Sequence, residues 1–168
     1  MARDILNNFT LFMDGGPEVG NVMSFTPPNL GITEEDFKAA GLDIPISVDQ
    51  GMEKMQARFV MHNQSQSSLA RFGLATGINT ILKVKGVVKD TNTGVPAAVY
   101  HTCTGKVVSI EQSEWQPGQK AGVTVTMTLS YYQQTYNGVP VITVDRDNYI
   151  REIAGVDQLA GQRVILGR

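Results

Sequence analysis

Histidine and cysteine, two residue types that could carry out chemistry, lie close together at His101 and Cys103. Residues two apart on a strand share a face, so this pair could supply a nucleophile and its base, or two metal ligands. A zinc site needs about four ligands, and the only other histidine, His62, belongs to a separate predicted strand. We therefore expect a buried cysteine near a surface histidine, with no metal and no cofactor.

The acidic residues give no catalytic pattern either. Acid–base catalysis needs paired carboxylates, but the aspartates are scattered through predicted turns, where they would serve as turn and cap residues. These aspartates are Asp43, Asp49, Asp145, Asp147 and Asp157. Gly15-Gly16 precedes a proline rather than a helix, so it does not form a phosphate-binding loop. We predict that the protein is not an enzyme.

Length and charge limit the class of protein. A chain of 168 residues suits a single domain, residues 1–168, with a core of its own. A net charge of −2 and a pI near 5.6 argue against a protein that holds nucleic acid through a basic surface. The single cysteine cannot form an internal disulfide. The amino terminus lacks a signal-peptide core, and no stretch approaches the roughly 20 apolar residues of a membrane helix. We expect the chain to fold in a cytoplasm.

The elements that would position functional residues are organised around a hairpin from Val123 to Asp145. Apolar and polar residues alternate over ten residues, and Asn137-Gly138 favours a type I′ turn. We predict one face with Val123, Val125, Met127, Leu129 and Tyr131, and another with Thr124, Thr126, Thr128, Ser130 and Tyr132. The second face is uncharged, so it is either an ordinary solvated strand or a surface that meets another protein or a lumen. The missing N–H of Pro140 should face outward, where no further strand can pair.

Most other segments also alternate. They predict strands at Phe9–Met13, Val19–Phe25, Met52–His62, Leu82–Lys89 and Ala97–Ile110, and Tyr149–Ile153 could form a last one. Ser65–Leu74 predicts a helix, and Gly155–Arg168 is a tail punctuated by glycines. Leu30–Leu42 allows a short helix or a strand that runs into a loop. The predicted fold is mainly β, an antiparallel β-sandwich or open barrel with one short α-helix.

Several segments together resemble a known family. They read ILNNFTLFMDG, then FTPPNLGITEEDFKAAGLDIPISVDQGMEKMQARF, LARFGL, SYYQQTYNGVPVITVD and REIAGVDQLAGQR. In this order they resemble the tail tube proteins of contractile phage tails of the P2 type and of R-type bacteriocins. The resemblance covers nearly the whole chain and is weakest between Asn79 and Gly122.

The resemblance implies that six copies form a ring, that rings stack into a hollow tube, and that a contractile sheath surrounds the tube. It also implies that the sheet of each subunit continues into its neighbours and closes an inner barrel, which would remove open strand edges. In the family, the region equivalent to Leu30–Met61 is a long hairpin that reaches the adjacent ring. This favours a strand at Leu30–Phe37 and a ring-stacking loop at Gly41–Gly51. The candidate stacking residues are Gly41, Asp43, Pro45, Asp49 and Gly51.

Three other surfaces become candidates on the same basis. The inter-subunit or lumen strand would carry Thr124, Thr126, Thr128 and Ser130. The tail would form an inter-subunit joint through Asp157, Gln158 and Gly161. A face with Lys83, Lys85 and Lys89 would either meet the sheath or be an ordinary solvated strand face.

The implied partners are other copies in stacked hexameric rings, the tail sheath protein, the tape measure protein, and the baseplate and tail terminator proteins, with no small-molecule substrate. The tube would belong to a virion assembled in the host bacterial cytoplasm, and in a phage DNA would pass along it. The sequence does not separate a phage from a bacteriocin or another injection system. The alternative is a monomeric ligand- or sugar-binding β-sandwich with Trp115, Tyr131, Tyr132 and Tyr136 as its platform, but an aromatic content of 7% makes this weak.

Overall fold

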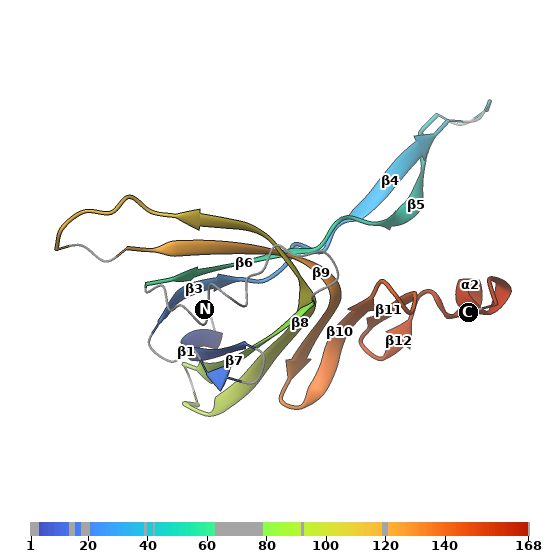
Figure 1. Ribbon diagram of the computed structural model, residues 1–168. Helices are drawn as coiled ribbons and strands as arrows, with labels where there is room; N and C mark the ends of the chain where they lie inside the picture. The colour runs from blue at the N-terminus through green and yellow to red at the C-terminus, as the bar shows by residue number, and fades with distance from the viewer. Residues whose placement is uncertain are drawn as a thin grey trace.

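The computed structural model describes residues 4–13, 16–17, 21–38, 40–41, 43–62, 79–91, 93–118 and 121–167, and consists mainly of antiparallel strands (Figure 1). The strands are β1 (Asp4–Met13), β2 (Gly16–Pro17), β3 (Val22–Thr26), β4 (Ile32–Phe37), β5 (Ile46–Met52), β6 (Gln56–Met61), β7 (Thr80–Asp90), β8 (Pro96–Gln112), β9 (Val123–Tyr136), β10 (Val139–Asp145), β11 (Ile150–Ile153) and β12 (Val156–Asp157). A short helix, α2 (Ala160–Ile165), follows them. The predicted mainly β, antiparallel fold is confirmed. Within the described ranges, no helix is long and apolar enough to cross a membrane.

Two long strands, β8 and β9, belong to both layers of a sandwich. The first half of β9 pairs with β6, and its second half pairs with β10. Only the first part of β8, as far as Gly105, pairs with β7. A four-stranded layer therefore has the order β3-β6-β9-β8, and a large layer has the order β12-β11-β10-β9-β8-β7-β1-β2. The long β8–β9 hairpin bends from one layer into the other.

A β-bulge lies at this bend. Tyr131 is opposite Thr104 and Leu129 is opposite Gly105, which leaves Ser130 as the extra residue. The bulge reverses the alternation along β9, so Tyr132 points into the core and is 1% exposed. The predicted faces are correct up to Leu129 and wrong for Ser130, Tyr131 and Tyr132, since Ser130 is the inserted residue and its insertion exchanges the faces that follow it.

Gly105 permits the close approach of the two strands at the bend. A Cβ at this position would overlap the carbonyl oxygen of Thr128 and lie 2.8 Å from the Cα of Leu129. Backbone atoms cannot rotate away as a side chain can, so any larger residue would push the strands apart.

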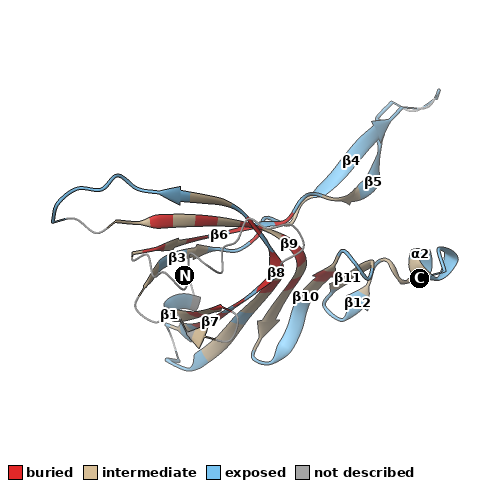
Figure 2. Cartoon of the chain, viewed as in Figure 1, coloured by how far each residue is buried: buried red, intermediate tan, exposed pale blue. Residues whose placement is uncertain are grey.

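The hydrophobic core fills the space between the two layers (Figure 2). The four-stranded layer contributes Ala57, Phe59, Met61, Val123, Val125 and Met127, and the large layer contributes Leu11, Met13, Leu82, Val84, Cys103, Tyr132 and Val144. Full burial of a valine, leucine, phenylalanine or methionine side chain stabilises the fold by about 1.5–3 kcal/mol. The alternating sequences therefore place their apolar sides against each other across the sandwich.

A two-stranded arm, Ile32–Met52, projects from the sandwich and consists of β4 and β5 with their connection (Figure 1). The predicted strand at Leu30–Phe37 is confirmed by β4, and the helix interpretation is wrong because these residues pair with β5. The predicted loop Gly41–Gly51 is too long, because β5 already begins at Ile46.

The predicted hairpin and its turn are confirmed. Asn137 and Gly138 have φ angles of 47° and 83°, as a type I′ turn requires, and Tyr136 pairs with Val139. Pro140 lies opposite Thr135 of β9, and β11 pairs with β10 only from Ile142 onward, so no described strand pairs with Pro140 on the side away from β9.

Two predicted segments have different outcomes. The predicted helix Ser65–Leu74 lies outside the described residues. The tail, Gly155–Arg168, contains β12 and α2.

Candidate assembly surfaces

The arm has two chemically different sides. Phe37 pairs with Ile46 and Glu35 with Val48 on one side, which leaves three apolar side chains there between 45% and 62% exposed. The other side carries Asp36 opposite Ser47 and Glu34 opposite Asp49. The Ser47 hydroxyl donates to Glu34 at 2.8 Å. An isolated hairpin is marginally stable in water, and an exposed apolar side marks a contact surface.

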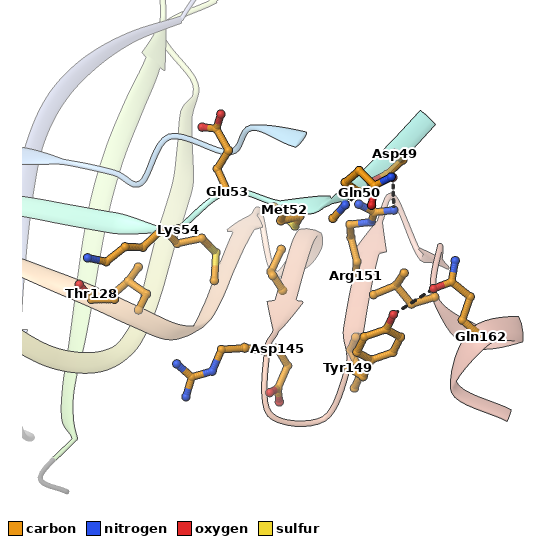
Figure 3. Close-up of a pocket in the computed structure, with 17 residues that line it drawn as sticks. Asp49, Gln50, Met52, Glu53, Lys54, Thr128, Asp145, Tyr149, Arg151 and Gln162 are labelled. Atoms are coloured by element: carbon orange, nitrogen blue, oxygen red, sulfur yellow. Dashed lines mark hydrogen bonds and ion pairs between the residues drawn. The ribbon is translucent and has the colours of Figure 1, made fainter. Parts of the chain in front are cut away.

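The root of the arm is held by a charged contact. The Arg151 guanidinium on β11 donates to the Asp49 carboxylate at 2.8 Å, and the Arg151 side chain is only 12% exposed (Figure 3). This hydrogen bond, together with one from the Gly51 amide at 2.7 Å, holds the pKa of Asp49 below its usual value. Gly51 has a φ of 111°, which favours glycine. Asp49 and Gly51, both predicted for ring stacking, thus shape the arm of their own subunit.

A cavity of about 630 Å³ lies beside this contact (Figure 3). Its walls come from the arm root, the bend of β9, the turn between β10 and β11, and the carboxyl-terminal segment. The hydroxyl of Tyr149 donates to the Gln162 side chain at 3.0 Å, which ties α2 to this turn. The root of the arm and the carboxyl-terminal segment therefore line the same cavity.

The carboxyl-terminal segment is organised around Asp157. Its carboxylate accepts the Leu159 amide at 3.0 Å and the Arg151 amide at 3.4 Å, and forms an ion pair with Arg163 at 2.7 Å. These contacts, the Leu159 amide first, lower the pKa of Asp157. The other two predicted tail residues, Gln158 and Gly161, are exposed. Asp157 has a role inside its subunit that the sequence did not indicate.

The threonine face of β9 lies on the outside of the four-stranded layer. Thr124, Thr126 and Thr128 are half-buried there. Their cross-strand neighbours bring charge to the same surface, because Arg58 lies opposite Thr126, Lys106 opposite Thr128 and Glu111 opposite Thr124. Ser130 does not belong to this face: it is 7% exposed and donates to the Thr104 carbonyl at 3.3 Å.

The lysine face, Lys83, Lys85 and Lys89, lies on the outside of the large layer. These side chains are exposed, whereas the alternate residues Leu82 and Val84 are buried. The Lys85 ammonium lies 5.0 Å from the ring centroid of Phe12 and 5.8 Å from that of Tyr100. This arrangement combines positive charge with aromatic surface.

The four-stranded layer has open edges on both sides. Among the residues that the structure describes, β3 pairs only with β6, and β8 from Lys106 to Gln112 pairs only with β9. Within the described part of the chain, the backbone groups along these edges are available to another strand.

His101 and Cys103 point into the subunit. Cys103 is fully buried, which raises its thiol pKa to about 12, far from that of a nucleophile. We expected His101 on the surface, but it is half-buried. Its Nδ1 lies 2.9 Å from the Tyr132 hydroxyl, and burial lowers the pKa of the imidazole. No group of three potential metal ligands occurs in the described parts of the chain.

The predicted aromatic platform does not form. Tyr132 is buried while Tyr131 faces the other side of the sheet, and Trp115 lies in a loop, 74% exposed. These side chains offer no common stacking surface.

Nearly the whole chain is similar to known proteins. A family model described as phage tail tube protein FII matches residues 3–167. The tail tube protein of Escherichia phage P2 is 24% identical over 165 residues, which cover 96% of each chain. The major tail tube protein of Serratia phage KSP20 is 22% identical over 147 residues, 86% of this chain and 84% of that one.

One solved structure has a similar fold. A chain in the cryo-EM structure of the anti-feeding prophage baseplate, determined with 6-fold symmetry, matches with a TM-score of 0.50. The match covers 80% of this chain and 93% of that chain at 10% sequence identity, so it bears on the fold alone.

Proposed function

Because the chain belongs to the phage tail tube protein FII family and is a structural subunit of a contractile tail tube, we propose that six copies close into a ring and that the rings stack into a hollow conduit. The family is a structural one, and its members assemble with sheath and baseplate components as part of a virion.

The observation that carries the ring is the pair of open edges on the four-stranded layer. Strand directions alternate across β3-β6-β9-β8, so β8 of one subunit runs antiparallel to β3 of a neighbour placed beside it. Pairing these edges around the ring continues the ladder in the same alternating pattern. Closure would satisfy both edges and form the inner barrel.

In such a ring the outside of the four-stranded layer would line the lumen, because its other face is filled by the core. Thr124, Thr126 and Thr128 would then form much of the lumen wall. The nearby charges are mixed, with Arg58 and Lys106 against Glu111. In a phage, a wall without a strong basic surface would let DNA pass without being held through counterion release.

The arm is proposed as the element that stacks rings. It carries exposed apolar side chains that its own subunit does not cover, and its connection contains Gly41, Asp43 and Pro45, all exposed. Contact with a copy in the next ring would bury the apolar side. Asp49 and Gly51 would contribute indirectly, by fixing the direction of the arm.

The tail would support contacts between subunits. Val164, Ile165 and Leu166 are between 60% and 86% exposed, next to the proposed joint residues Gln158 and Gly161. Truncation after Gly155 should impair assembly, and assembly that is unchanged would remove the tail from this proposal.

Two other partners are proposed. The tape measure protein would lie inside the tube, and the tail terminator protein would bind at its end. Assembly would take place in the host cytoplasm.

Negative-stain electron microscopy of the purified protein at increasing concentration tests the proposal. We expect rings and then hollow tubes of uniform width, with seeding by preformed tube fragments where nucleation is slow. A protein that stays monomeric even when seeded would contradict it and favour the ligand-binding β-sandwich. Lysine at Asp43 or Pro45 should stop stacking and leave rings intact, whereas tubes of normal length would count against the arm as the stacking element.

A further inference from the structure

Charge is unequally divided between the arm and the rest of the chain. Residues 32–52 contain five acidic residues and one lysine, a net charge of −4. The remaining residues contain thirteen basic and eleven acidic residues, a net charge of +2. Arms of neighbouring copies should therefore repel each other and be attracted to a basic part of the sandwich.

The lysine face of β7 is such a part. In register with Lys83 are Phe12 and Thr102, and in register with Lys85 are Thr10 and Tyr100. None of these neighbours is acidic. Ile81 and Val87 flank the lysines on the same face of β7 and are 45% and 40% exposed. The outside of β7 is thus a basic and partly apolar sheet surface that its own subunit leaves uncovered.

The acidic side of the arm matches this surface in spacing. Glu34 and Asp36 lie two residues apart on β4, and Lys83 and Lys85 lie two residues apart on β7. Side chains two apart on a strand are about 7 Å apart along it. Two carboxylates can therefore face two ammonium groups when the arm lies along β7. Asp49 is excluded from this contact because Arg151 binds it at the root.

We propose that the lysine face of β7 binds the acidic side of the arm of a second copy of this chain in the adjacent ring, with Glu34 and Asp36 opposite Lys83 and Lys85. This rests on the proposed stacking of rings and names the surface that receives the arm. It assigns the lysine face to the tube itself rather than to the sheath.

Charge reversal tests the pairing. We expect E34K/D36K and K83E/K85E each to raise the critical concentration for tube formation, measured by sedimentation of seeded protein, by about tenfold or more. Combining all four changes should restore the critical concentration to within about threefold of the wild-type value, since opposite charges again face each other. E114K/D147K makes the same change in net charge as E34K/D36K at exposed sites outside residues 32–52 and outside β7, and should leave the critical concentration unchanged.

Other controls separate the possible causes. Circular dichroism and thermal unfolding verify that each variant folds, and K83Q/K85Q replaces the lysine variant if the glutamates disturb Phe12 and Tyr100. A combined variant as defective as its parents overturns the pairing. So do bare tubes of K83E/K85E that form normally but no longer bind sheath protein, because the lysines then face the sheath. If wild-type protein fails to form tubes when seeded, the proposed function itself fails, and this inference with it.

Discussion

β4 and β6 are strands of equal length with opposite environments. Each has six residues, yet β6 buries Ala57, Phe59 and Met61 on one side, whereas all of β4 is exposed. β6 lies between two other strands, whereas β5 is the only described strand beside β4. The same local structure therefore contributes to the core of the subunit in β6 and forms an exposed surface in β4.

The comparison implies that apolar residues in the two strands stabilise different states. Those in β6 stabilise the folded subunit, because water leaves them on folding. Those on the arm remain exposed in the folded subunit, and under the proposed stacking another copy would cover them. Stability of the subunit and assembly of the tube should thus be separable by mutation.

Replacing phenylalanine by alanine in each region is the sharpest way to test this. Phe59→Ala should lower the free energy of unfolding by about 3–5 kcal/mol, because it leaves a cavity in the core. Phe37→Ala should change it by less than about 0.5 kcal/mol, as at other exposed positions, while reducing tube formation. Urea denaturation measures the first effect and sedimentation the second. Equal losses of stability in the two variants would break the distinction.

The bend of the β8–β9 hairpin offers the next largest effect. Gly105→Ala should destabilise the subunit by about 1–3 kcal/mol, because the added carbon overlaps the backbone of β9. Gly161→Ala is the matched control, since nothing lies within 4 Å of its added carbon and alanine is favoured in helices. If Gly105→Ala denatures at the same urea concentration as wild type, the close approach of the strands is not needed.

The arm root gives the smallest effect, and one that depends on pH. The folded-state pKa of Asp49 lies below its usual value of 3.8, so its ion pair stabilises the fold above that pH and is lost as the pH falls through the lower, folded-state pKa. The stability difference between wild type and Asp49→Asn, measured by urea denaturation, should be present at pH 6 and shrink toward pH 3. A difference that persists unchanged at low pH would show that Asp49 acts through something other than its charge.

The sequence predicted the elements whose signals are local. Asn137-Gly138 between alternating segments specified the hairpin and its turn, because few other residues adopt positive φ there. Thr33 to Asp36 did not specify β4, because the same residues also suit the first turn of a helix. Family resemblance, rather than any local signal, decided between the two.

Other features depend on contacts between distant residues. Arg151 and Asp49 are 102 positions apart, and nothing near either residue indicates the pair. Ser130 continues the alternation of β9, so its bulge could not be predicted from that strand. The partner strand does carry a local signal, since an isolated glycine inside a strand, here Gly105, often marks a bulge or a close backbone approach.

The continuity of β8 and β9 through both layers has a mechanical consequence. Two separate sheets would transmit force only through side chains that can slide over one another. Here the covalent backbone crosses from layer to layer, and the interstrand hydrogen bonds on either side of the Ser130 bulge share the strain. Axial load on the four-stranded layer would therefore reach the large layer with little slippage, so that the subunit behaves as one stiff element under compression.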